Sequence, residues 1–140
     1  MFVNKLIAQE TPRCYTPSHH VGGFLGQGGP SRFSIEHGVL DGVHIVTISG
    51  EADIYASESI RGVLEGLSDE MPVIVDLRTC SYIDSSVVSA LIRMRKHRTA
   101  PVRLVIDKNS IVNRVVELTQ IGTIMPVTGT VEDAKKQLES

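Results

Sequence analysis

Apolar and polar residues alternate along the chain from Phe33 onward, as they do in β-strands that bury one face. The dipeptide Asp41-Gly42 interrupts this alternation, and Asp-Gly favours the tight two-residue turns that join antiparallel strands. The pattern therefore predicts a β-hairpin in this part of the chain. Its apolar positions include Phe33, Ile35, Val43, Ile45 and Ile48.

Helical and strand-like patterns follow one another after the hairpin. Apolar residues recur at three- and four-residue spacing over residues 56–67, which predicts an amphipathic helix that covers one face of a sheet. The β-branched run at 73–75 is typical of a strand buried on both faces, and it is expected to lie centrally in the sheet. A second buried strand is predicted over residues 102–106.

Three more helices are predicted over residues 85–97, 111–118 and 131–138. The first begins at Ser85, behind Asp84, because aspartate and serine favour helix N-termini. The second is expected to end near Gly122, since glycine commonly terminates helices. The third is preceded by Thr130, which is spaced from Asp133 as the two residues of a capping box are.

This alternation predicts one α/β domain, with a mixed β-sheet that has parallel members, a hairpin at its N-terminal end and about four flanking helices. A chain of 140 residues and 15.3 kDa accommodates one such domain with a tail. Residues 1–31 are rich in turn-forming residues and glycine, which predicts a flexible N-terminal arm before a domain over residues 32–140. The arm lacks the Gly-Lys-Ser/Thr sequence of a phosphate loop, and its histidines His19 and His20 are assigned no role.

Composition and charge exclude several classes of function. A formal net charge of -2 leaves no basic field for nucleic acid, and the absence of Trp removes the usual stacking platform for bases. No apolar run reaches the roughly 20 residues of a membrane span and no secretion signal is evident, so a cytoplasmic protein without direct membrane insertion is expected. Cys14 and Cys80 are expected to be free thiols, and neither a metal site nor a cofactor is indicated.

Three segments carry a more specific pattern. The first is Ser-Gly-Glu-Ala-Asp at residues 49–53. The second is Val-Ile-Val-Asp-Leu at 73–77 followed by Tyr-Ile-Asp-Ser-Ser at 82–86, and the third is Val-Val-Glu-Leu-Thr-Gln-Ile at 115–121. In this order and spacing they resemble the STAS domain of bacterial anti-sigma factor antagonists, which carries Gly-Glu-Leu-Asp, Asp-Ser-Ser-Gly-Leu-Gly and Leu-Thr-Gly-Leu. The resemblance covers residues 33–138, nearly everything outside the arm.

The resemblance implies partner switching, in which the domain binds an anti-sigma factor with a serine-kinase fold and so releases a sigma factor. Phosphorylation of one serine ends this binding. By position the phosphoacceptor is Ser85, with Ser86 the less favoured choice, and Asp53 and Asp84 are acidic residues that shape the site. Ser86 and Ser89 belong to the expected partner surface, and no catalytic residue is expected in this chain.

The residues at 84–86 by themselves leave two interpretations open. Asp-Ser-Ser before an apolar helix is also what simple N-capping requires, and Asp53 is alternatively a surface turn residue. A helix N-terminus does accommodate a phosphate, because its backbone N–H groups carry partial positive charge. Phosphate adds about -1.5 to -2 charge, so modification of Ser85 is expected to preserve folding and to oppose a partner interface. Arg93 and Lys96 are interpreted as a solvated face.

The chain departs from the family pattern at two positions. Val87 and Ser89 stand where the family has glycines, and these larger side chains are expected to hinder a kinase or to reshape its contact. Two other functions stay open. One is a STAS subunit that regulates a membrane transporter, and the other is an enzyme that uses one of the two serines as nucleophile with His97 or His44 as base. The absence of Gly-x-Ser-x-Gly argues against the enzyme.

Overall fold

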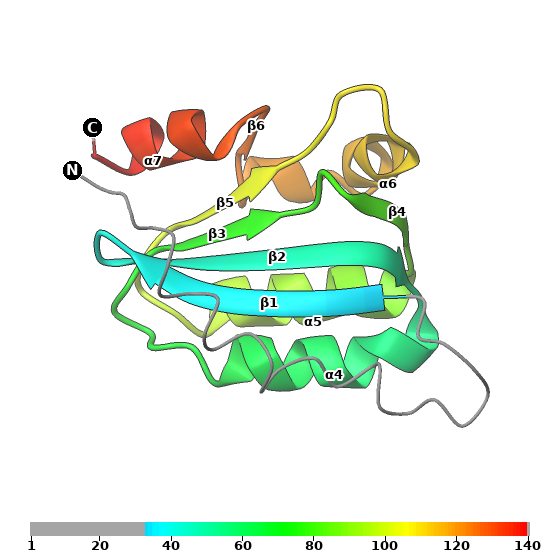
Figure 1. Cartoon of the computed structure of the whole chain (residues 1–140), viewed down its shortest axis with the longest axis horizontal. Coiled ribbons are helices and arrows are strands. Elements are labelled where there is room, and N and C mark those ends of the chain that lie inside the picture. The colour runs from blue at the N-terminus through cyan, green and yellow to red at the C-terminus, as the bar shows by residue number, and fades with distance from the viewer. Residues whose placement is uncertain (1–32, 140) are drawn as a thin grey trace.

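A six-stranded β-sheet with helices on both faces occupies residues 33–139, the part of the chain that this computed structural model describes (Figure 1). The strands are β1 Phe33–Leu40, β2 Val43–Ala52, β3 Val73–Asp76, β4 Cys80–Ile83, β5 Val102–Val105 and β6 Val127–Thr128. The helices are α4 Ile54–Glu65, α5 Ser85–Lys96, α6 Ile111–Thr119 and α7 Val131–Glu139, with a 3-10 turn η3 at Ile121–Thr123. The predicted mixed sheet is confirmed: its order is β1-β2-β3-β5-β6 with β4 beside β2, and only β1 and β2 pair antiparallel.

The predicted hairpin and its turn are confirmed. Asp41 and Gly42 have φ angles of 53° and 78°, so both turn residues take the left-handed conformation that a type I′ turn requires. The pairing of Leu40 with Val43 closes this turn. The register then places Ile35 opposite Ile48, and both side chains point into the core.

Strand β2 changes partner at Gly50, which the sequence did not predict. Its first part pairs with β3, and its last residues pair with β4 after a register shift next to Gly50. Gly50 has a φ of 84°, a conformation that glycine adopts without strain, and its N–H donates to the carbonyl of Thr79 at 3.0 Å. Strand β4 then brings the chain to Asp84, whose N–H donates to the carbonyl of Ala52 at 2.9 Å.

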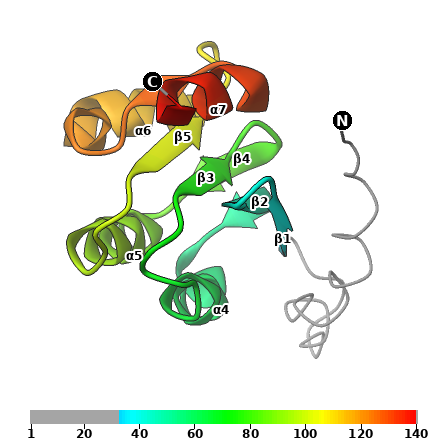
Figure 2. The ribbon, with the colours of Figure 1, turned by 90° about the vertical axis from the view of Figure 1, so that its left-hand side faces the viewer.

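Two apolar layers hold the helices to the sheet. The larger core lies between the sheet and α4, α5 and α6, which Figure 2 shows on the same side. The smaller core lies between α7 and the opposite face of β3 and β5, around Ile74, Val105 and Ala134. Because strand β3 is buried on both faces, its predicted central position is confirmed.

Both predicted ends of α4 and the predicted stop residue of α6 were wrong. Helix α4 begins at Ile54 and ends at Glu65, two residues earlier than expected at each end, because the Asp53 side chain caps its first turn. Helix α6 ends at Thr119, and its C-cap is Gln120 with a φ of 60°, not a glycine near 122. The N-terminus of α7 agrees with the sequence, since the Thr130 hydroxyl accepts from the N–H of Asp133 at 3.0 Å.

The predicted arm over residues 1–31, with Cys14, His19 and His20, lies outside the described residues. Cys80 is a buried free thiol. Between residues 33 and 139, no helix has both the length and the apolar character needed to cross a bilayer.

A buried histidine holds the loop between α4 and β3 at one end of the sheet. The N–H of Ser68 donates to Nε2 of His44 at 3.2 Å, so Nε2 carries no proton. The ring proton is therefore on Nδ1, which donates to Nε2 of His37 at 2.9 Å. Burial lowers the pKa of His44, and the positive charge of Arg98 lowers it further. Neutral His44 is thus part of the folded structure.

We expect the free energy of unfolding to decrease as the pH falls below about 6.5, the ordinary pKa of histidine. The lowered pKa of His44 means that the unfolded chain binds a proton there before the folded chain does, so stability is fully present above this pH and is lost below it. Urea denaturation from about pH 8 to pH 5 should show the decrease, and His44→Gln should flatten it. The exposed His97, replaced by glutamine, is the matched control and should leave the curve unchanged. A wild-type curve that is flat over this range would contradict the assignment.

Candidate protein-docking site

The N-termini of α4 and α5 lie side by side at one edge of the sheet. Each helix follows one of two adjacent parallel strands, β2 and β4, and the pairing of Ala52 with Ile83 aligns the ends of these strands. The residues after this pair are Asp53 and Asp84, the N-caps of the two helices. The structure therefore brings together the two acidic residues that the sequence proposed for one site.

Both aspartates act as helix caps. Oδ1 of Asp53 accepts from the N–H of Ala56 at 3.0 Å. Oδ2 of Asp84 accepts from the N–H of Ser86 at 2.8 Å and from its hydroxyl at 2.6 Å, while the Tyr82 hydroxyl donates to Oδ1 at 3.4 Å. The Ser86 hydroxyl and N–H are the main causes that lower the pKa of Asp84, so this carboxylate is ionised at neutral pH.

The two serines have different surroundings. Ser85, the first residue of α5, is exposed, and its hydroxyl makes no hydrogen bond within the described part of the chain. Ser86 is half-buried, and its hydroxyl proton is engaged by Asp84. Ser89 lies one helical turn after Ser85 on the same exposed side. Ser85 and Ser89 therefore present hydroxyl groups that a partner can contact, whereas the Ser86 hydroxyl is already bound to Asp84.

Exposed apolar side chains flank these serines, and the sequence analysis did not identify them. Ile54 and Tyr55 in the first turn of α4 are 59% and 86% exposed, and Tyr82 in β4 is 44% exposed. Their signal was present in the sequence, because Ile54 and Tyr55 precede the apolar positions that repeat along this helix and have no place in its buried stripe. Clustered exposed aromatic and aliphatic side chains are typical of surfaces that bind proteins.

A family model described as the STAS domain matches residues 34–134, which is most of the chain. The chain belongs to the STAS domain family. The resemblance inferred from the three sequence segments is thereby confirmed.

Several solved structures share the fold of this STAS domain. An anti-sigma factor antagonist from Mycobacterium paratuberculosis is 19% identical, with a TM-score of 0.66 over 77% of this chain and 95% of that one. The anti-sigma factor antagonist SpoIIAA in its unphosphorylated form is 22% identical, with a TM-score of 0.56 over 77% of this chain and 98% of that one. The Bacillus cell fate determinant SpoIIAA in the phosphorylated form is 21% identical, with a TM-score of 0.55 over 76% and 98% of the two chains. At these identities the likeness establishes the fold.

Val87 and Ser89, which stand where the STAS family has glycines, change the site less than the sequence suggested. The Val87 side chain is 0% exposed and packs in the larger core, so it does not lie on the surface around Ser85. Direct contact of the Val87 side chain with a kinase is therefore not expected, while the effect of this position on phosphorylation stays a prediction. Ser89 is exposed, and of the two substituted positions it is the one that alters the surface.

Neither histidine considered as a catalytic base lies beside the serines of this STAS domain. His97 is the C-cap of α5, twelve residues after Ser85 and so about 18 Å along the helix. Both ring nitrogens of His44 are engaged, one by His37 and the other by Ser68. Arg93 and Lys96 are exposed in the second half of α5. Among the described residues, no group of three or more His, Cys, Asp or Glu side chains could hold a metal ion.

Proposed function

We propose that this STAS domain is a non-enzymatic, cytoplasmic anti-sigma factor antagonist. It binds an anti-sigma factor with a serine-kinase fold and thereby releases a sigma factor, and phosphorylation of Ser85 ends the binding. The observation that carries the proposal is an exposed serine at the head of α5, flanked by exposed apolar side chains, in a domain of this family. The surface, called the docking face below, consists of Ile54, Tyr55, Tyr82, Ser85, Ser86 and Ser89.

The docking face has the chemistry of a protein interface. Tyr55 and Tyr82 combine a large apolar ring with a hydroxyl, and tyrosine is enriched among the residues that dominate binding energy at interfaces. Ile54 adds exposed apolar surface beside Tyr55. The carboxylates of the caps Asp53 and Asp84 accept from backbone N–H groups of their own helices, so the face offers a partner mainly apolar surface and hydroxyl groups.

The arrangement at the head of α5 supports Ser85 as the switch. Asp84 already accepts from the N–H of Ser86, and the N–H of Val87 donates to the Asp84 carbonyl at 3.0 Å. A phosphate on Ser85 therefore finds few free donors at the helix start and remains at the surface beside an ionised carboxylate. Two adjacent negative groups oppose an acidic or apolar partner surface, and burying them requires their desolvation. SpoIIAA, which shares this fold, has been observed in both a phosphorylated and an unphosphorylated form.

Affinity capture from the native lysate, with identification of the bound protein, tests the proposed function. We expect wild-type protein to retain an anti-sigma factor with a serine-kinase fold. Recovery of a transporter subunit in its place would overturn the proposal and favour the alternative of a transporter regulator.

Replacement of Tyr55 by alanine is expected to weaken binding of the anti-sigma factor about 30-fold, which corresponds to about 2 kcal/mol for a central interface aromatic. Isothermal titration calorimetry measures the affinity. Folding should be preserved because the Tyr55 side chain is 86% exposed. The matched control is Leu118→Ala, since Leu118 is 76% exposed on α6 and lies outside the docking face. Equal losses for both variants would remove Tyr55 from the interface.

A further inference from the structure

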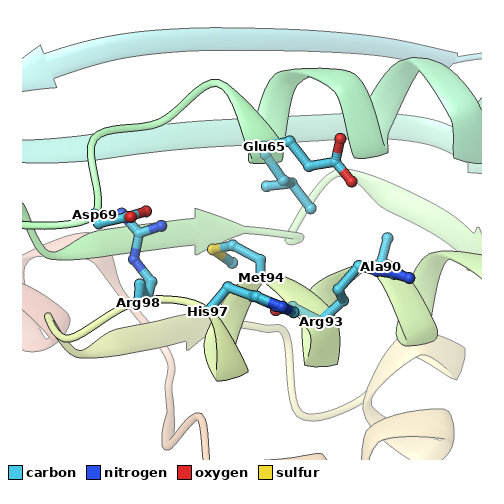
Figure 3. Close-up of a pocket in the computed structure, with 8 residues that line it drawn as sticks. Glu65, Asp69, Ala90, Arg93, Met94, His97 and Arg98 are labelled. Carbon is cyan, nitrogen blue, oxygen red and sulfur yellow. The ribbon is translucent and has the colours of Figure 1, made fainter.

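A cleft opens between α4 and α5 at the end of α5 that lies away from Ser85 (Figure 3). Its volume is about 360 Å³, near the lower end of the range for small-molecule sites. The apolar part of its lining comes from Leu64, Ala90 and Met94. No residue of the docking face lines this cleft, so the cleft is a separate surface.

The polar lining of the cleft separates the two signs of charge. Arg93, His97 and Arg98 come from the end of α5 and the residue that follows its cap, while Glu65 and Asp69 come from the end of α4 and the loop after it. Within the described residues no ion pair joins the two sides. The ion pair that Glu65 forms is with Arg61 of its own helix, at 3.9 Å.

Arg98 is a buried cation, and no carboxylate between residues 33 and 139 forms an ion pair with it. It is 7% exposed, and its Nη2 donates to the backbone carbonyls of Ser68 and Met71. Its Nε has no hydrogen-bond partner, and no ion pair to Arg98 occurs among the described residues. A buried charge that is only partly compensated is costly, so a further anion near Arg98 stabilises the site. Asp69 attracts Arg98 electrostatically without forming that pair.

We propose that the cleft binds a small zwitterionic amino acid with an aliphatic side chain. Its carboxylate lies against Arg93 and His97, on the side of the cleft that also carries Arg98, while its ammonium group faces Glu65. The aliphatic side chain covers Leu64, Ala90 and Met94. A ligand of a single charge would leave one side of the cleft uncompensated, which is why the separated charges favour a zwitterion over a simple anion or amine.

Titration of the full chain with L-leucine, L-valine and L-methionine tests this site, by calorimetry and by amide chemical shifts in NMR spectra. At least one of these amino acids is expected to bind saturably, with shifts centred on Ala90, Met94 and Asp69. Two probes each lack one charge of leucine: 4-methylpentanoate and 3-methylbutylamine. Each is expected to bind at least about tenfold more weakly than leucine.

Substitutions of exposed lining residues complete the test without disturbing the core. Arg93→Gln and Glu65→Gln are each expected to weaken amino-acid binding about tenfold, whereas Lys96→Gln, on the same helix but outside the lining, should leave it unchanged. Circular dichroism of each variant confirms its folding. The proposal is overturned if none of the three amino acids saturates the protein, if 4-methylpentanoate binds as tightly as leucine, or if the shifts centre elsewhere. These outcomes do not depend on whether the docking face binds an anti-sigma factor.

Discussion

Replacement of Ser85 by aspartate is expected to weaken binding of the anti-sigma factor about 100-fold, since an unpaired charge placed in an interface costs several kcal/mol. The thermal midpoint should change little. Ser85 is exposed at the first position of α5, where negative charge interacts favourably with the helix dipole. Calorimetric titration measures the affinity, and thermal denaturation of the same samples measures the stability.

Two controls separate charge at this position from other effects. Ser85→Asn changes the side chain without adding charge and is expected to retain most of the affinity. Thr123→Asp adds the same charge at an exposed position of η3, beyond the C-terminus of α6, and should bind as the wild type does. Unchanged affinity for Ser85→Asp would remove Ser85 from the switch while leaving the Tyr55 test of the docking face intact.

The fold was largely predictable because its elements repeat apolar residues over enough positions to show a period. Strand β4 was missed for a physical reason. It has four residues, two of them exposed, and it pairs with β2 only because Gly50 redirects that strand. The residue that stops α6 was predicted wrongly, as Gly122, because Gln120 takes a left-handed conformation that sequence rules assign to glycine or asparagine.

The candidate site was predictable only in part. The caps Asp53 and Asp84 and the exposed Ser85 follow from the order of the sequence segments, but which residues surround them depends on the pairing of β2 with β4. Tyr55 was missed because the helix was predicted to begin only at residue 56, so an apolar residue just before it and outside the buried stripe was not examined as part of the helix. The position of the Val87 side chain was predicted wrongly because Val87 follows Ser85 closely in the sequence. Helical geometry nevertheless directs the two side chains to different sides of α5.

Replacement of Val87 by glycine is expected to lower the free energy of unfolding by about 3 kcal/mol. Removal of a fully buried valine side chain costs about 2 kcal/mol, and a glycine inside a helix costs about 1 kcal/mol more than alanine. This is a large fraction of the 5 to 15 kcal/mol that is typical of a whole domain. Ser89→Gly, at an exposed position of the same helix, is the matched control and should cost less than about 1 kcal/mol. Urea denaturation midpoints measure both.

The same two variants decide whether the positions that replace the family glycines hinder phosphorylation. Intact mass follows phosphate incorporation at Ser85 by the captured anti-sigma factor, with rates corrected for the folded fraction of each variant. Because Val87 lies in the core, Val87→Gly is expected to leave the corrected rate unchanged, whereas any gain in rate should appear in Ser89→Gly, which opens the exposed surface one turn from Ser85. A faster corrected rate for Val87→Gly would contradict this and show that Val87 limits phosphorylation of Ser85. If neither variant nor the wild type is phosphorylated by an anti-sigma factor that binds all three, the serine switch is wrong and docking is constitutive.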